Sequence, residues 1–176
     1  MDFYLSRSLV EIMPLVVRRI LAFIIDYFII LAYAGILFGV SFLIADPQPL
    51  HPIKAQILGF VTLTLPIFLY SFLLEKSSYR ATLGKRLMKL SVQYSNSIDV
   101  AQRNFLKYLP WEIAHTGIHW LMFYSWSEQE IPLWVWVLTY LSQLLALVYF
   151  ISLFRAKGTK TLYDFLAGTR LVYRNH

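Results

Sequence analysis

The sequence predicts an all-α membrane protein with four transmembrane helices, a cytoplasmic amphipathic helix and a short two-stranded β ribbon. Two observations predict this class. Of the 176 residues, 58% are hydrophobic and only 15% are charged, and the mean hydropathy is +0.56, so too little polar surface is left for a water-soluble domain. The apolar residues also form long runs, and about 20 of them, at a rise of about 1.5 Å each, cross a hydrocarbon core of about 30 Å.

Four apolar runs are expected to span the bilayer. The first, residues 20–45, has one charged side chain, Asp26, and the second and fourth, residues 55–74 and 131–154, have none. The third, residues 109–126, is the most polar of the four. The first run is longer than the apolar part of a signal peptide, so we expect it to be a membrane helix.

The distribution of charge predicts the orientation of these spans. Of the 16 lysines and arginines, 15 lie on one side of a four-span arrangement, and only Lys54 lies on the other. Because cytoplasmic loops are rich in lysine and arginine, both termini, the loop 76–108 and the segment 155–176 are expected on the cytoplasmic side of a bacterial inner membrane. Residues 1–176 would then form one domain. The basic excess suits anionic lipid headgroups, and nucleic acid is not expected as a partner.

The cytoplasmic loop is expected to be structured. Residues 78–90 alternate basic and apolar side chains at helical spacing, which predicts a helix lying on the membrane surface. Its apolar face would consist of Leu83, Leu87 and Leu90. Gly84 would let this segment approach a membrane helix closely. The alternating segments 89–94 and 168–174 are expected to pair as the β ribbon.

Asp26 is the first candidate functional residue. A charged aspartate deep in a membrane costs about 2.5–3.5 kcal/mol, unless it is protonated, paired with a cation from another segment or hydrated in a cavity. Arg19 lies on the same helical stripe but about 10 Å away along the axis, too far for a firm ion pair. Three interpretations stay open: a structural ion pair that holds the first helix to the cytoplasmic loops, a carboxylate that binds and releases H⁺ or a small cation, and a surface position caused by a shifted span boundary.

The third span has a polar face formed by Glu112, His115 and His119, whose spacing places them on one side of a helix. This face could be structural and hydrogen-bonded, it could relay protons, since histidine titrates near neutral pH, or it could bind a metal. A closed zinc site needs four ligands and a di-iron bundle needs a second Glu-x-x-His pair. No metal site and no cofactor are therefore expected. No nucleophile–base arrangement is recognised, so an enzyme is not expected.

Three blocks of the sequence resemble the RDD family of prokaryotic membrane proteins. They are RRILAFIID, YRATLGKRLMKLSV and TKTLYDFLAGTRLV, and the resemblance extends over the chain from about residue 18 to about residue 173. By position, the arginine and two aspartates for which the family is named would be Arg19, Asp26 and Asp164. Members often have fewer spans than the four expected here. The resemblance implies transport, because some members are described as Na⁺(Li⁺, K⁺)/H⁺ antiporters.

The same blocks lead to a hypothesis about the site. A polar cluster at the cytoplasmic face would be built from Arg19, Asp26, Asp164, Lys85 and Arg86. The last two side chains would bind either lipid phosphates or a carboxylate.

Two functions are compatible with these features. The first is a secondary transporter that exchanges protons for small monovalent cations through its buried carboxylates. Because four helices enclose little space, such a transporter is expected to be a homo-oligomer. The alternative is a non-transporting membrane scaffold, or an accessory module that binds anionic lipid for a partner protein. Flux of cations that depends on pH would distinguish the two.

Overall fold

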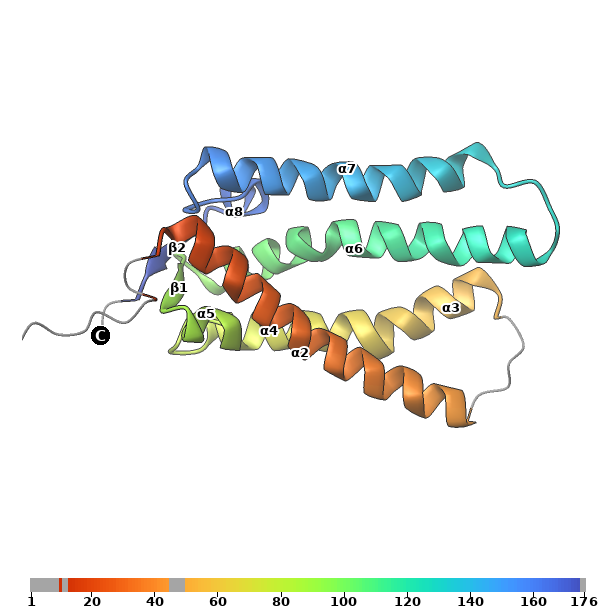
Figure 1. Cartoon of the computed structure of the whole chain (residues 1–176), viewed down its shortest axis with the longest axis horizontal. Coiled ribbons are helices and arrows are strands. Elements are labelled where there is room, and N and C mark those ends of the chain that lie inside the picture. Colours follow the sequence, from red (N-terminus) through yellow and green to blue (C-terminus); the bar gives the residue numbers. More distant parts are fainter. Residues whose placement is uncertain (1–9, 11–12, 45–49, 175–176) are drawn as a thin grey trace, which may run out of the picture.

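The structure is a computed structural model that describes residues 10, 13–44 and 50–174. Its long helices run lengthwise beside one another, and its short elements gather at one end (Figure 1). The long rods are α2 (Leu15–Ile44), α6 (Ser97–Trp126), α7 (Leu133–Arg155) and a composite rod of α3 (Pro52–Gly59), η1 (Phe60–Thr64) and α4 (Leu65–Lys76). The short elements are α5 (Leu83–Leu87), β1 (Leu90–Gln93), α8 (Leu162–Leu166) and β2 (Arg170–Tyr173).

Three helical segments are long and apolar enough to cross a membrane. They are Leu15–Leu43, Pro52–Lys76 and Leu133–Arg155, with mean hydropathies of 2.4, 2.2 and 1.9. These segments agree with the first, second and fourth expected spans and confirm the helical membrane class. Residue 45, the last of the first expected run, lies outside the described residues. The expected third run, 109–126, is helical as part of α6.

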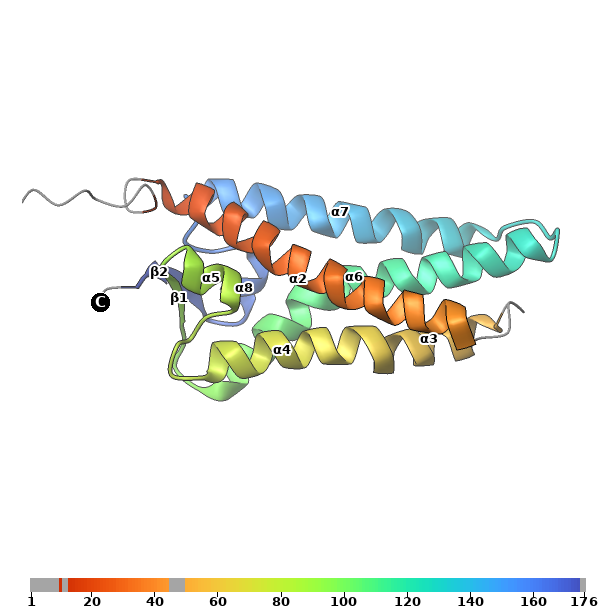
Figure 2. The ribbon, with the colours of Figure 1, turned by 60° about the horizontal axis from the view of Figure 1, so that its bottom comes forward.

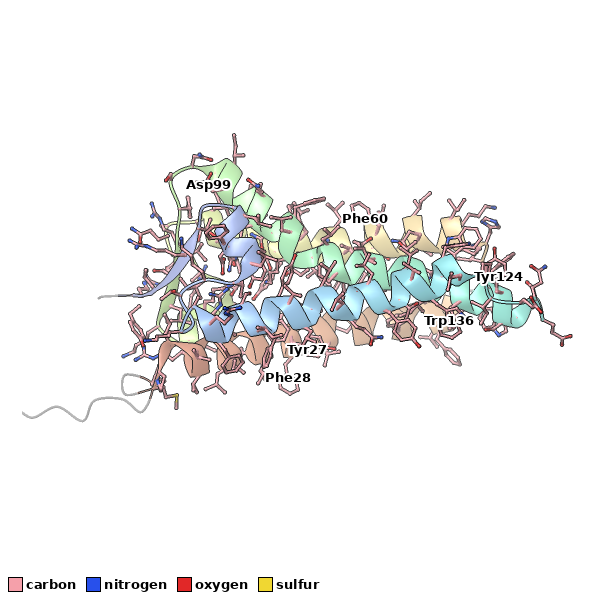
Figure 3. The ribbon with its side chains drawn as sticks, turned by 90° about the horizontal axis from the view of Figure 1, so that it is seen from above. Tyr27, Phe28, Phe60, Asp99, Tyr124 and Trp136 are labelled. Atoms are coloured by element: carbon pink, nitrogen blue, oxygen red, sulfur yellow. The ribbon has the colours of Figure 1, made fainter. Side chains whose placement is uncertain are left out.

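Large apolar side chains cover the outside of the long helices. Phe28 on α2 is 66% exposed, and Phe28 and Phe60 point away from the bundle (Figure 3). Such a surface is unfavourable in water and favourable against lipid. Helix α2 crosses the other rods obliquely (Figure 2) and packs mainly against α5.

The β ribbon forms as the alternating sequences predict. Strands β1 and β2 pair antiparallel, with Val92 opposite Leu171. Because an isolated two-stranded ribbon is marginal in water, its stability must come from packing. Leu90, Val92 and Leu171 are buried against Ala22 of α2, so the base of the first membrane helix supports the ribbon.

The expected surface helix over residues 78–90 is shorter in the structure. Helix α5 has five residues, and the chain leaves it through Lys89, which has a φ of +53°. Leu83 and Leu87 are exposed, whereas Leu90 is fully buried in β1. The three leucines therefore do not form one apolar face, because the last belongs to a strand.

Pro66 interrupts the composite rod. Proline has no N–H to donate and disturbs the carbonyl four residues before it. The backbone relaxes into the π-helical η1 immediately before the α4 segment that contains Pro66. The carbonyl of Thr62, four residues before Pro66, accepts a hydrogen bond from the hydroxyl of Tyr33 on α2. A neighbouring helix thus supplies a donor at the interrupted position.

Pro110 interrupts α6 in the same way. The carbonyl four residues earlier belongs to Leu106, and it accepts a hydrogen bond of 2.9 Å from the hydroxyl of Tyr149 on α7. In an apolar surrounding a bare carbonyl is costly. These two tyrosines therefore explain how prolines are tolerated within long helices.

Candidate functional site

Seven charged side chains meet where the short elements gather, and we refer to them as the charged cluster. They come from the first turns of α2, the end of α4, α5, the first half of α6 and the start of α8. The members are Arg19, Asp26, Glu75, Lys85, Arg103, Lys107 and Asp164. Most of them are buried, and five of the seven form salt bridges with one another.

Asp164 ties α8 to α2 and α6. Its carboxylate pairs with Arg19, and its Oδ1 lies 2.7 Å from Nε of Arg103. The same carboxylate accepts the N–H and the hydroxyl of Thr161 at 2.9 and 2.8 Å, forming the capping box of α8. Sequence blocks about 140 residues apart are thereby joined.

The environment of Asp164 predicts a loss of stability in acid. Burial alone raises its pKa, but Arg103, Arg19 and the hydrogen bonds lower it from 3.8 to about 2. A depressed pKa in the folded state stabilises the protein above the unfolded-state value, and this contribution disappears as the pH falls. We expect wild type to lose about 2 kcal/mol between pH 5 and pH 2 through this group.

The measurement is the unfolding free energy in detergent across that pH range. Asp164→Asn should remove most of this pH dependence and be less stable at pH 5. Glu130→Gln, which changes an exposed loop carboxylate, should leave the wild-type curve unchanged. If the unfolding free energy of Asp164→Asn fell as steeply between pH 5 and pH 2 as that of wild type, Asp164 would not be the source of the acid sensitivity.

Glu75 is fully buried at the end of α4 and has three donors. Lys85 Nζ lies 2.6 Å from its Oε1, Arg103 pairs with Oε2, and Asn104 Nδ2 donates to Oε2 at 2.9 Å. Arg103 thus bridges Glu75 and Asp164. Neither Glu75 nor Arg103 was a predicted site residue. The one sequence feature that could have identified them is the position of Glu75, an acid at the end of the second apolar run and directly before a strongly basic loop.

Asp26 is held differently, by neutral donors. Its Oδ2 accepts the hydroxyl of Thr82 at 2.5 Å, and its Oδ1 accepts the N–H of Gly84 at 2.9 Å and the hydroxyl of Tyr70 at 3.1 Å. No lysine, arginine or histidine in the described part of the chain forms a salt bridge with it. Asp26 is buried, so the interpretation as a surface position is wrong. It joins α2 to α5 by hydrogen bonds and not by an ion pair.

The expected close approach at Gly84 is confirmed. A Cβ added there would lie 2.2 Å from the carbonyl oxygen of Ala22 and 3.0 Å from Cγ of Asp26. Only glycine lets the N–H of this residue reach the Asp26 carboxylate at the observed distance.

Arg86 does not join the charged cluster, so its predicted place there is wrong. Its guanidinium stacks 3.9 Å from the ring centroid of Tyr79 and donates to the carbonyl of Ala81. The reason is helical geometry, because neighbouring residues on a helix point about 100° apart. When Lys85 points inward to Glu75, Arg86 must point elsewhere.

A cavity of about 340 Å³ borders the charged cluster. Asp26 and Lys107 lie at its polar part, whereas Phe23 of α2 and Phe150 and Leu153 of α7 form apolar walls. This volume falls within the range of about 300–1,000 Å³ that is common for small-molecule sites.

A second polar group lies farther along α6. Glu112 accepts hydrogen bonds from Nε2 of Gln56, at 2.8 Å, and from the hydroxyl of Thr64. His115 Nδ1 lies 3.7 Å from Glu112, and the rings of His115 and His119 stack with centroids 6.2 Å apart. The predicted polar face therefore exists, and Glu112 turns toward α3 and η1. Within residues 13–44 and 50–174, no group of three or more His, Asp or Glu side chains is arranged to hold a metal.

Comparisons with known proteins place the chain in a family. No curated protein and no solved structure matches it. The model of the RDD family matches residues 13–168, a range that contains Arg19, Asp26 and Asp164. This match covers most of the chain and includes every element that contributes to the charged cluster. The chain therefore belongs to the RDD family.

Proposed function

We propose that this protein is a transporter that exchanges protons for small monovalent cations, with Asp26 as the carboxylate that binds both. The observation that carries this proposal is the contrast among three carboxylates. Glu75 and Asp164 are held by basic side chains, whereas Asp26 has only neutral donors among the described residues and borders the cavity. A buried acid in a membrane helix is by default a functional candidate.

The neutral partners of Asp26 suit such exchange. A carboxylate in an ion pair must first lose its partner before it can bind another cation, and a buried pair is costly to break. A hydroxyl group is both a donor and an acceptor, so by rotating it can point either its hydrogen or its oxygen lone pairs at the site. Thr82 and Tyr70 could therefore donate to the ionised carboxylate or turn their oxygen lone pairs toward a cation beside it.

The proposed topology includes residues 109–126 of α6 as the third of four spans. Helix α6 runs beside α7 for most of its length (Figure 1). The carboxylate of Glu112 accepts hydrogen bonds from Gln56 and Thr64 inside the bundle, so its charge need not face lipid. The positive-inside rule then places both termini and the charged cluster on the cytoplasmic side of a bacterial inner membrane.

A homo-oligomer is part of the proposal. Helix α2 packs on the rest of the chain mainly through α5. Much of its apolar surface, including Phe28, is therefore free to pack against a second copy or against lipid.

The test is transport by the purified protein in proteoliposomes. A pH gradient is imposed, Li⁺, Na⁺ or K⁺ is added, and proton movement is followed with an internal dye. Asp26→Asn should reduce cation-dependent proton flux by at least about tenfold, which corresponds to about 1.4 kcal/mol. Glu130→Gln, at an exposed loop, should transport like wild type.

Equal flux in Asp26→Asn and wild type would remove Asp26 from the mechanism. Absence of flux in wild type with every cation would favour the scaffold or lipid-binding alternative.

A further inference from the structure

The charged cluster contains more basic than acidic side chains. Four of its members are basic and three are acidic, so at least one positive charge lacks a counter-charge. Arg19 pairs with Asp164, Lys85 pairs with Glu75, and Arg103 pairs with both carboxylates. Two members remain, the acid Asp26, which has neutral donors, and the base Lys107, and neither forms a salt bridge within the described part of the chain.

Lys107 is nevertheless set into the protein. It is half-buried and borders the cavity, and its Nζ donates to the hydroxyl of Tyr108 at 3.2 Å. Desolvation lowers the pKa of its ammonium group, but Tyr108 and Glu75 raise it, and the net direction is upward. Lys107 therefore stays charged at neutral pH. Glu75 is shared with Lys85 and Arg103, which form salt bridges with it, so Lys107 has no carboxylate of its own and this position favours a bound anion.

The rest of the cavity is suited to a hydrocarbon chain. Helices α2 and α7 contribute Ile20, Phe23, Ile30, Phe150 and Leu153 to its walls. A small inorganic anion would gain nothing from these side chains. An acyl chain would gain about 25 cal/mol for each Å² of apolar surface that it covers in place of water. One charged end and one apolar end together match an anionic amphiphile.

We propose that the cavity binds an anionic membrane lipid, with its headgroup at Lys107 and part of an acyl chain against the apolar walls of α2 and α7. Basic pockets between helices on the cytoplasmic side are a known form of site for acidic headgroups. This inference goes beyond cation transport and does not depend on it. The bound headgroup would neutralise the excess positive charge that otherwise opposes a cation at Asp26.

Native mass spectrometry of the detergent-purified protein tests the proposal. The probes are phosphatidylglycerol and phosphatidylcholine with identical chains. Wild type should prefer phosphatidylglycerol by at least about tenfold. Lys107→Gln should lose this preference, and Lys107→Arg, which keeps the charge, should retain it. The matched control is Lys76→Gln, because Lys76 is exposed at the same end of the molecule but outside the cavity.

The position of the lipid is tested in a second experiment. The chain has no cysteine, so single cysteines can be placed at Ala146, which lines the cavity, and at Leu144, which is exposed on the same helix. Phosphatidylglycerol should slow alkylation of Ala146→Cys and not of Leu144→Cys. Adding Lys107→Gln should remove that protection.

Three results would overturn the proposal. The first is an unchanged lipid preference in Lys107→Gln, and the second is an equal loss in Lys76→Gln, which would show a general surface effect. The third is displacement of phosphatidylglycerol by inorganic phosphate at equal concentration, which would show that the acyl chain contributes nothing. None of these measurements involves transport, so their outcome is separate from that of the flux experiment.

Discussion

Replacing Arg103 with methionine is expected to lower the free energy of unfolding by about 3–5 kcal/mol, the usual cost of removing one partner from a buried ion pair. Arg103 is 1% exposed and pairs with both Glu75 and Asp164. Its loss would leave two buried carboxylates with fewer counter-charges, and each would be only partly compensated by Lys85 or Arg19. Methionine replaces the apolar stem of arginine without its guanidinium group, so the effect reports the loss of the charge, of the hydrogen bonds and of that group's volume.

The measurement is denaturant or thermal unfolding in mild detergent, followed by tryptophan fluorescence. Arg155→Met is the control, because Arg155 is exposed at the end of α7, and it should change stability by less than about 0.5 kcal/mol. Adding Glu75→Gln to Arg103→Met should deepen the loss, because Glu75 is still paired with Lys85 and that buried ammonium group would then lose its carboxylate. Similar losses in Arg103→Met and Arg155→Met would contradict the bridging role.

Gly84→Ala is expected to be strongly destabilising, because among the seven glycines this is where an added Cβ comes closest to another atom. The new Cβ would lie 2.2 Å from the carbonyl oxygen of Ala22, which is backbone and cannot rotate away. Helix α5 would have to move off α2, and the Gly84 N–H would lose Asp26. Overpacking costs about 1–3 kcal/mol, and a buried carboxylate that loses a donor adds about 1–3 kcal/mol.

Gly39→Ala provides the matched control. Gly39 lies in α2, and an added Cβ there meets nothing within 4 Å. Alanine is a better helix former than glycine by about 1 kcal/mol, so this variant should be neutral or more stable. Thermal unfolding of the two variants side by side should therefore shift in opposite directions. A Gly84→Ala variant as stable as wild type would show that α5 does not need this close approach.

The sequence predicted those features of the fold that depend on local pattern. Apolar runs identified the three segments that the structure shows to be long and apolar enough for a membrane. Alternation identified both strands and their pairing. The surface helix was too long in the prediction because residues 78–90 have helical spacing, whereas burial of Leu90 against Ala22 draws the end of that segment into a strand.

The candidate site was predictable only in part. Arg19, Asp26, Lys85 and Asp164 lie in recognisable blocks, and the structure brings them to one end of the bundle. Arg103 belongs to no such block, and nothing in its local sequence shows that it contacts carboxylates 28 and 61 residues away. Arg86 was misplaced because composition cannot show which of two adjacent basic residues points inward.

The two proline-disturbed carbonyls have a mechanical consequence. Pro66 and Pro110 each remove one backbone hydrogen bond from their helix. Each carbonyl left without that bond accepts a tyrosine hydroxyl from a different neighbouring helix, Tyr33 on α2 or Tyr149 on α7. A movement of α2 along the composite rod would break the hydrogen bond of Tyr33 and leave that of Tyr149 intact. A movement of α7 along α6 would do the reverse. The bundle thus has two bending points that can respond separately to movements of its first and last long helices.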